Sequence, residues 1–233
     1  MSTKLEHQPS NARREAGGSE ALGACPQIIL SFDTALGECS VALWKDGKIA
    51  AAKYETERNR QTSQLVPMIE AVMQESGVGF TDLSHIVTTS GPGSFTGIRI
   101  GLSVARGFTL ACGVPSLAVS TLELLAWQAT AIEKEKPIAI AINAYRGEVY
   151  VQSFAYHGTL KPLCEAQAIP AEEWDNAFPA ATYHRVTDTT HRPDAAALAE
   201  YVAHHSLSAA HYPPTPFYIR APDAKIQTPL LAS

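Results

Sequence analysis

The most distinctive candidate for chemistry is a glycine-rich loop that runs into a helix. Residues 90–112 read SGPGSFTGIRIGLSVARGFTLAC. A loop at a helix N-terminus can bind an anion, because free N–H groups and the helix dipole point toward it. It is not a Walker loop, since no Lys-Ser or Lys-Thr follows the glycines. The loop is therefore either a phosphate site, with Gly91, Gly93 and Ser94 as candidate contacts, or a tight turn that binds nothing.

Asp33 is a further candidate, because it follows the apolar run of residues 28–30 that predicts a buried strand. A carboxylate there can hold a metal or a nucleotide's phosphates through water, although an Asp at a strand end more often caps a turn. The rest of the chain contains no H-x-x-x-H, H-E-x-x-H, C-x-x-C or G-x-S-x-G motif. We therefore predict no catalytic residue, no metal ligand and no cofactor.

The helix that follows the loop is apolar on two faces, and Arg99 and Arg106 are its only charged residues. Gly97 and Gly101 lie one turn apart, where the missing Cβ atoms would admit a second helix. The helix is either a central helix of this chain or it gives one face to another subunit. On the second interpretation Gly101→Leu should abolish a complex and leave the monomer folded. The predicted partner interface comprises Gly97, Ile98, Ile100, Gly101, Val104, Ala105 and Phe108.

The elements that must position these residues begin with three strands. Residues 40–44 and 48–54 flank Asp46-Gly47, a pair typical of a tight hairpin turn. A helix over residues 62–76 should kink or restart at Pro67 and end at Gly77. A strand at 85–89 precedes the loop, and a strand at 115–119 follows the loop's helix.

The next helix should begin at Thr121, because Ser120 and Glu123 have the spacing of a capping box. The charged stretch 133–136 indicates a seam between two halves. Beyond it, residues 138–142 and 148–156 predict strands, and residues 194–205 predict a helix whose inward residues are Leu198, Tyr201 and Val202. The Pro-rich segment 213–229 should be irregular.

Composition indicates a globular protein. Of 233 residues, 45% are hydrophobic and 18% are charged, which is enough to bury a core in one large domain or two small ones. A phosphate backbone attracts clustered Lys and Arg, and a net charge of −5 indicates no such cluster. Any RNA should therefore be held by a partner. No run of about 18 apolar residues could span a membrane. The separated cysteines fit a reducing cytosol, and residues 1–26 predict a disordered extension.

A family resemblance emerges from four segments: ILSFDTALGECSVALWKDG, GPGSFTGIRIGLSVARGFTLACGVPSLAVSTLELLA, NAYRGEVY and PFYIRAPDAK. Together they resemble the TsaB family, also called YeaZ, from residue 27 to about residue 225. The resemblance implies a two-lobed α/β fold of the actin-like, Hsp70-like (ASKHA) type. Its first lobe would be residues 27–132, with the partner-binding helix, and its second, smaller lobe would be residues 133–233, with a C-terminal tail.

The resemblance also implies a function. A TsaB protein would be a non-catalytic dimerisation or scaffold subunit that activates TsaD, the transferase that adds threonylcarbamoyl to N6 of the adenosine beside the tRNA anticodon. TsaD and the ATPase TsaE would be its partners, TsaC would supply threonylcarbamoyl adenylate, and tRNA would be bound only through the complex. A homodimer in isolation is an alternative assembly. Asp33, Gly91, Gly93 and Ser94 would then be vestigial nucleotide or phosphate contacts.

One comparison with TsaD concerns the metal. The TsaD segment that matches residues 119–126 carries a metal-binding His-x-x-x-His pair, and these positions are Thr121 and Leu125 here. Leucine has no lone pair to offer a metal, so the clamp cannot form. The sequence also departs from the usual TsaB pattern at Gln61-Thr62, where many relatives have histidine before serine, and at Asn143, where aspartate is usual.

Two other functions compete with the scaffold. One is a stand-alone enzyme, either an actin-fold ATPase or a metallopeptidase-like protein, which would need a phosphate-binding set or a metal clamp that the sequence lacks. The other is a direct tRNA-binding module, which the net charge of −5 disfavours.

Overall fold

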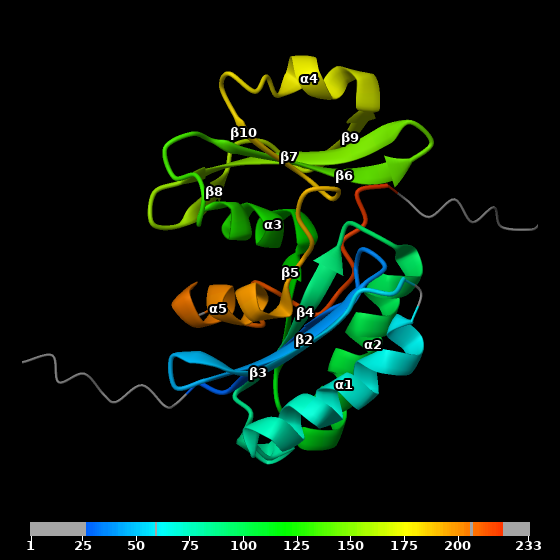
Figure 1. Ribbon diagram of the computed structural model, residues 1–233, viewed down its shortest axis with the longest axis vertical. Helices are drawn as coiled ribbons and strands as arrows, with labels where there is room; N and C mark the ends of the chain where they lie inside the picture. Colours follow the sequence, from blue (N-terminus) through cyan, green and yellow to red (C-terminus); the bar gives the residue numbers. More distant parts are fainter. Residues whose placement is uncertain (1–26, 59, 206, 221–233) are drawn as a thin grey trace, which may run out of the picture.

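Two five-stranded sheets form the frame of the protein, with helices on both sides of the first (Figure 1). This is a computed structural model, and it describes residues 27–58, 60–205 and 207–220. The first sheet has the order β3-β2-β1-β4-β5. Its strands are β1 (Ile29–Asp33), β2 (Cys39–Lys45), β3 (Lys48–Glu55), β4 (His85–Gly91) and β5 (Ser116–Ser120). The disorder predicted for residues 1–26 falls outside the described residues.

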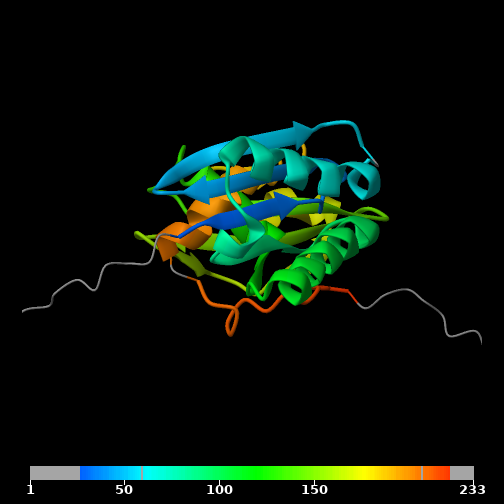
Figure 2. The ribbon, with the colours of Figure 1, turned by 90° about the horizontal axis from the view of Figure 1, so that it is seen from below.

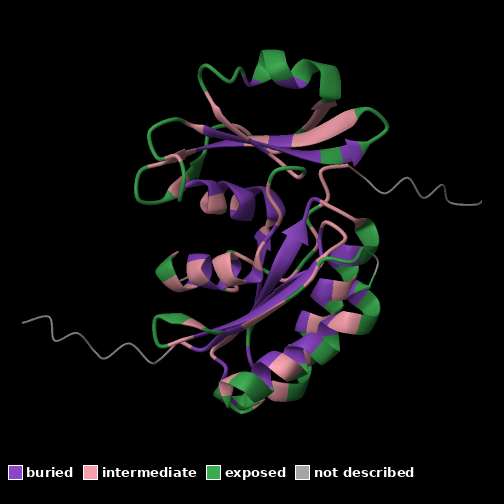
Figure 3. Ribbon diagram, in the orientation of Figure 1, coloured by how far each residue is buried: buried purple, intermediate pink, exposed green. Residues whose placement is uncertain are grey.

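The central strand β1 is buried along its whole length, because helices cover both faces of the first sheet (Figure 3). On one face, α1 (Gln61–Ser76) and α2 (Phe95–Cys112) pack over Leu30 and Phe32. On the other, α3 (Thr121–Ala129) and α5 (Ala195–His205) pack over Ile29. Ile29, Leu30 and Phe32 supply apolar side chains to the two faces. The two polar residues of the strand, Ser31 and Asp33, are buried and hydrogen-bonded within the chain.

The second sheet lies beyond α3 and has the order β10-β6-β7-β8, with β9 paired to β7. Its strands are β6 (Ile138–Tyr145), β7 (Glu148–Tyr156), β8 (Leu160–Pro162), β9 (Gln167–Pro170) and β10 (His184–Thr187). The short helix α4 (Trp174–Ala177) covers its outer face, and 3₁₀ turns occur at Phe80–Asp82 and Ala171–Glu173. Leu122 and Leu125 of α3 pack against Ile140 of β6, so α3 contributes to the cores of both sheets.

The strand directions confirm the predicted fold class. β1, β2 and β3 form an antiparallel meander, and β4 and β5 continue the sheet parallel to β1. This order, followed by a second sheet, is the two-lobed actin-like α/β arrangement. The seam predicted at residue 133 lies between α3 and β6, but α5 returns to the first sheet, where Ser31 Oγ donates to the Ala195 carbonyl at 2.6 Å.

Most predicted elements are present, including the hairpin at Asp46-Gly47 and the end of α1 at Gly77. Leu198, Tyr201 and Val202 are buried, as predicted. α1 runs through Pro67 as one helix, so the helix does not restart there. One prediction is wrong. The capping box is absent, because Glu123 Oε1 instead accepts hydrogen bonds from Tyr201 at 2.5 Å and Tyr212 at 2.9 Å.

After α5 the chain forms an irregular segment, residues 208–220, which we call the strap. It runs along the outside of the molecule beside α2 (Figure 2). Arg106 of α2 donates two hydrogen bonds to the Pro214 carbonyl, at 2.9 and 2.6 Å, and Phe217 N donates to Ser90 O at 2.8 Å. At its end Arg220 forms an ion pair with Glu148 of β7, so the strap joins the two lobes.

α5 offers a test of this packing. Asp194 is its N-cap, since Asp194 Oδ1 accepts from Ala196 N at 2.7 Å, and it also accepts from Tyr54 Oη at 3.2 Å. We predict that Asp194→Ala lowers the free energy of unfolding by about 1 kcal/mol, the usual cost of losing a cap. Urea denaturation followed by circular dichroism measures it. Glu135→Ala, at an exposed loop position, is the matched control, and equal stability of the two variants would contradict the assignment.

Candidate functional site

The glycine-rich loop packs backbone to backbone against the turn that follows β1. A Cβ atom at Gly93 would lie 2.5 Å from the Ala35 carbonyl oxygen, and one at Gly97 would collide with the Thr34 carbonyl oxygen. At Gly91, φ is +103° and a Cβ would lie 2.7 Å from Ile98 Cδ1. The glycines are therefore required by internal packing, which supports the interpretation of the loop as a tight turn.

The hydrogen-bonding groups of this loop are also satisfied internally. Ser94 caps α2 by accepting from Gly97 N at 3.3 Å, and its own N–H donates to Ala35 O at 2.7 Å. Asp33 is 3% exposed, and it accepts from Thr89 Oγ1 at 2.5 Å and from Ala35 N. Of the four candidate nucleotide contacts, Gly93 and Ser94 line a cleft between the lobes, Asp33 lines a separate small pocket, and Gly91 is buried.

The predicted partner interface divides into two groups. Gly97, Ile98, Gly101 and Ala105 are buried against the chain's own sheet. A Cβ at Gly101 would lie 2.7 Å from Thr88 Oγ1 and 2.8 Å from Thr34 Oγ1. These four residues face the chain's own sheet and do not form a surface for a partner, so a leucine at Gly101 should disturb the monomer's own packing.

The other three predicted interface residues are half-buried between α2 and α1. Ile100, Val104 and Phe108 pack on the core below α1, and the Phe108 ring stacks on Phe80 with centroids 5.0 Å apart. The outer face of α2 carries a different set of exposed residues, which the sequence analysis missed. We call it the outer face and define it as Arg99, Ser103, Arg106, Gly107, Leu110 and Ala111. The positions of Ser103, Gly107 and Ala111, four residues apart, were the available signal.

The glycines of α2 provide a stability test. We predict that Gly101→Leu lowers the melting temperature by several degrees, because overpacking costs about 1–3 kcal/mol. Gly107 has no atom within 4 Å of its Cβ position. Gly107→Ala should therefore raise stability by about 1 kcal/mol, through helix propensity alone. Thermal unfolding of both variants measures this, and a fully stable Gly101→Leu would refute the assigned orientation of α2.

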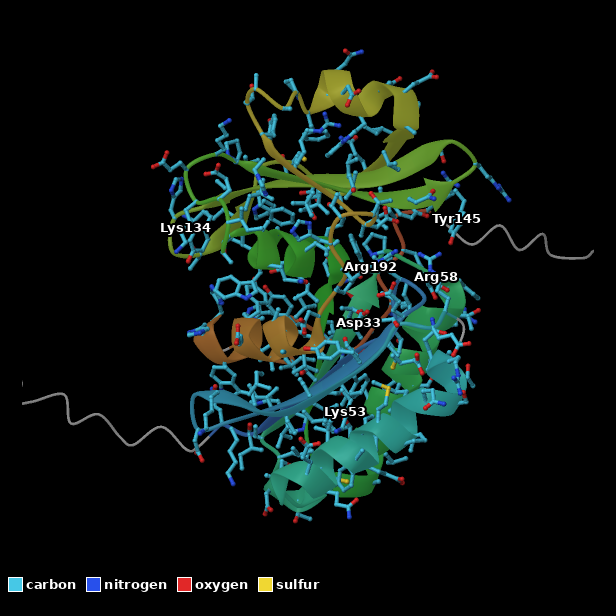
Figure 4. The ribbon with its side chains drawn as sticks, in the orientation of Figure 1. Asp33, Lys53, Arg58, Lys134, Tyr145 and Arg192 are labelled. Carbon is cyan, nitrogen blue, oxygen red and sulfur yellow. The ribbon has the colours of Figure 1, made fainter. Side chains whose placement is uncertain are left out.

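The front cleft, a space of about 480 Å³ between the lobes, is lined by Arg58, Asn143, Tyr145, Asp188 and Arg192, among others (Figure 4). Arg192 pairs with Glu38 at 3.2 Å. The β6–β7 turn presents Tyr145, 68% exposed, in a left-handed conformation with φ 61°. Asn143 holds this turn by accepting from Tyr145 N at 2.8 Å.

A smaller pocket of about 200 Å³ shares Leu36 and Arg192 with the front cleft. Its lining includes four acidic residues: Asp33, Glu38, Glu55 and Asp194. Burial raises the pKa of Asp33 to about 7, against the hydrogen bond from Thr89. Burial likewise raises the pKa of Cys39 to about 12. Among the residues that the structure describes, no group of three or more His, Cys, Asp or Glu could hold a metal ion.

Asp33 predicts a pH dependence of stability. Its pKa is about 7 in the folded state, against 3.8 as the ordinary value, so the folded protein binds more protons between these pH values. Stability should therefore fall as the pH rises from about 4 to about 7 and then level off. Asp33→Asn, which keeps an acceptor for Ala35 N, should remove this contribution. The free energy of unfolding of both proteins, measured by denaturation at several pH values, tests this prediction. The same pH dependence in the wild type and in Asp33→Asn would contradict the raised pKa of Asp33.

The two positions that match the metal-binding histidines of TsaD lie inside the protein. Thr121 and Leu125 are 0% exposed, and Leu125 belongs to the apolar core between α3 and the second sheet. The Thr121 hydroxyl has no hydrogen-bond partner among the described residues. A leucine in an apolar core offers nothing to a cation, so this part of α3 serves packing.

No helix in the described part of the chain is long and apolar enough to cross a membrane.

Comparison with known proteins identifies the family. The family model "TsaD: tRNA N6-adenosine threonylcarbamoyltransferase" matches residues 55–181. The Escherichia coli "tRNA threonylcarbamoyladenosine biosynthesis protein TsaB" is 40% identical over 122 residues, 52% of each chain. The Buchnera aphidicola (Schizaphis graminum) TsaB is 36% identical over 133 residues, 57% of this chain and 63% of the relative. The chain thus spans between half and two thirds of the length of these relatives.

Two solved structures have the same fold as this chain. YeaZ from Pseudomonas aeruginosa superimposes with a TM-score of 0.69 and 27% identity, covering 82% of this chain and 99% of that chain. A Pseudomonas aeruginosa protein "with similarity to peptidase YEAZ" gives a TM-score of 0.71 and 25% identity, covering 83% of this chain and 100% of that chain. From the family match, the curated relatives and these two structures, the chain belongs to the TsaB (YeaZ) family.

Proposed function

We propose that this protein is an accessory, non-catalytic subunit in the biosynthesis of threonylcarbamoyladenosine in tRNA, and that it acts by binding and activating a TsaD transferase. The names of its relatives support the pathway. The replacement of the TsaD histidine pair by Thr121 and Leu125 supports the lack of turnover, since Leu125 cannot bind a metal. TsaE would join the same complex, tRNA would reach the protein only through it, and the cytosol would be its compartment.

The outer face of α2 is the proposed contact with TsaD. The observation that carries this assignment is Gly107, an exposed glycine in the middle of an 18-residue helix whose Cβ position is open. A glycine there costs about 1 kcal/mol relative to alanine, and nothing in the described chain requires it. The close approach of a partner helix would require a glycine there. Ser103, Gly107 and Ala111 form a line of small residues on which such a helix could pack, beside Leu110, which is 90% exposed.

A stand-alone ATPase is the second candidate, and the front cleft favours it. Arg58 and Arg192 lie there beside Gly93 and Ser94 at the start of α2. The internal hydrogen bonds of Ser94 and Asp33 weigh against it, because they occupy the groups that a phosphate or its metal would use. ATP hydrolysis by the isolated protein that is lost in Asp33→Ala would establish this alternative.

Complex formation tests the scaffold. Size-exclusion chromatography with light scattering of the protein, alone and with TsaD from the same source, should show a stoichiometric complex. We predict that Gly107→Leu weakens that complex at least tenfold and leaves the monomer folded, because the side chain projects into the partner's space. Leu163→Asp, at a 54% exposed site of the second lobe, is the control and should bind normally.

The outcomes of this experiment are distinct. A wild-type complex that Gly107→Leu leaves unchanged would place the interface elsewhere on the protein. A wild-type protein that forms no complex with TsaD would overturn the scaffold proposal itself. A homodimer that Gly107→Leu disrupts would show that two copies use the same face when TsaD is absent.

A further inference from the structure

A second cavity between the lobes, about 490 Å³ in volume, lies under the strap. We call it the strap cavity. Three parts of the chain build it: the ends of β4 and β5 with the first turn of α3, strands β7 and β8 of the second sheet, and the strap. The residues used below are Ser90, Ser120, Glu123, Phe154, Tyr212 and Phe217.

The position of the strap cavity favours ligand binding. β4 and β5 are adjacent parallel strands, and Ser90 and Ser120, near and at their carboxyl ends, both line the cavity. Ligands of α/β proteins bind in the crevice outside the carboxyl ends of such strands. The front cleft shares no lining residue with the strap cavity, so the two are separate spaces.

Hydrogen-bonding groups at this wall lack protein partners. Ser120 is the N-cap residue of the nine-residue helix α3, yet its hydroxyl caps nothing and is buried without a partner among the described residues. A buried hydroxyl without a partner is energetically unfavourable, so a ligand that reaches it gains a hydrogen bond. Rotation about the single Cα–Cβ bond changes the direction of this group, so a ligand at the wall can engage it.

Glu123 adds an acceptor. Its Oε1 already receives the hydroxyls of Tyr201 and Tyr212, which hold the carboxylate away from the helix terminus and at the cavity wall. No described partner donates to Oε2. This oxygen is available to an N–H donor. No side chain caps the first turn of α3, so the N–H groups there lack a side-chain acceptor.

Charge and shape define the ligand. The strap cavity is lined by no Lys or Arg, by one histidine, His211, and by one acidic residue, Glu123. The absence of a permanent positive charge and the presence of a carboxylate disfavour phosphates and carboxylates. The walls include the rings of Phe154, Tyr212 and Phe217, on which a flat heterocycle stacks. We propose that the strap cavity binds an uncharged purine nucleoside, with its exocyclic or ring N–H groups donating to Glu123 and with Ser120 and the first turn of α3 contacting its acceptors.

Saturation-transfer NMR and isothermal titration calorimetry of the isolated protein with adenosine and with guanosine test this proposal. At least one nucleoside should bind, and its 5′-monophosphate should bind at least tenfold more weakly. Glu123→Gln and Ser120→Ala should each weaken binding several-fold without loss of the folded state, which circular dichroism checks. Glu135→Ala, at an exposed loop position, should bind like the wild type.

Three results would overturn the proposal: no binding of either nucleoside, binding that both cavity variants leave unchanged, or tighter binding of the monophosphate. The last result would point to the arginines of the front cleft instead. Because the isolated protein is used, the test does not depend on TsaD, and its failure would leave the proposed scaffold function intact.

Discussion

The close approach of α2 to the turn after β1 is the constraint on which the rest of the structure depends. Three glycines of the loop and helix, Gly93, Gly97 and Gly101, face backbone or hydroxyl oxygens at distances where no Cβ atom fits. The Thr34 hydroxyl donates to the Gly97 carbonyl at 2.7 Å and fixes the contact. This contact seats α2 on the sheet, orients its outer face toward solvent and sets where the strap can bind.

Local patterns predicted the elements well, and they failed where the relevant contact is distant in sequence. The apolar run at β1, the Asp46-Gly47 turn and the spacing of Leu198, Tyr201 and Val202 each act through neighbouring residues, so periodicity was sufficient. Gly101 shows the opposite case. Two glycines one turn apart fit a partner helix and the chain's own sheet equally well, and only the position of Thr34 and Thr88 distinguishes them.

Glu123 shows why the candidate site could be predicted only in part. Its spacing from Ser120 matches a capping box, but Tyr201 and Tyr212 lie 78 and 89 residues away along the chain and compete for the same carboxylate. Two hydrogen bonds from tyrosine hydroxyls stabilise the carboxylate more than one from a backbone N–H, so the capping box does not form. The strap cavity has walls from both lobes and the strap, and no sequence pattern brings those three parts together.

The position of α3 between the two sheets has a mechanical consequence. Its residues belong to the core with β1 and to the core with β6, so the helix is shared by both lobes. A hinge that opened the lobes widely would have to tear α3 from one of two hydrophobic cores, at a cost of several kcal/mol. α3 therefore restrains the two lobes against large movements relative to one another.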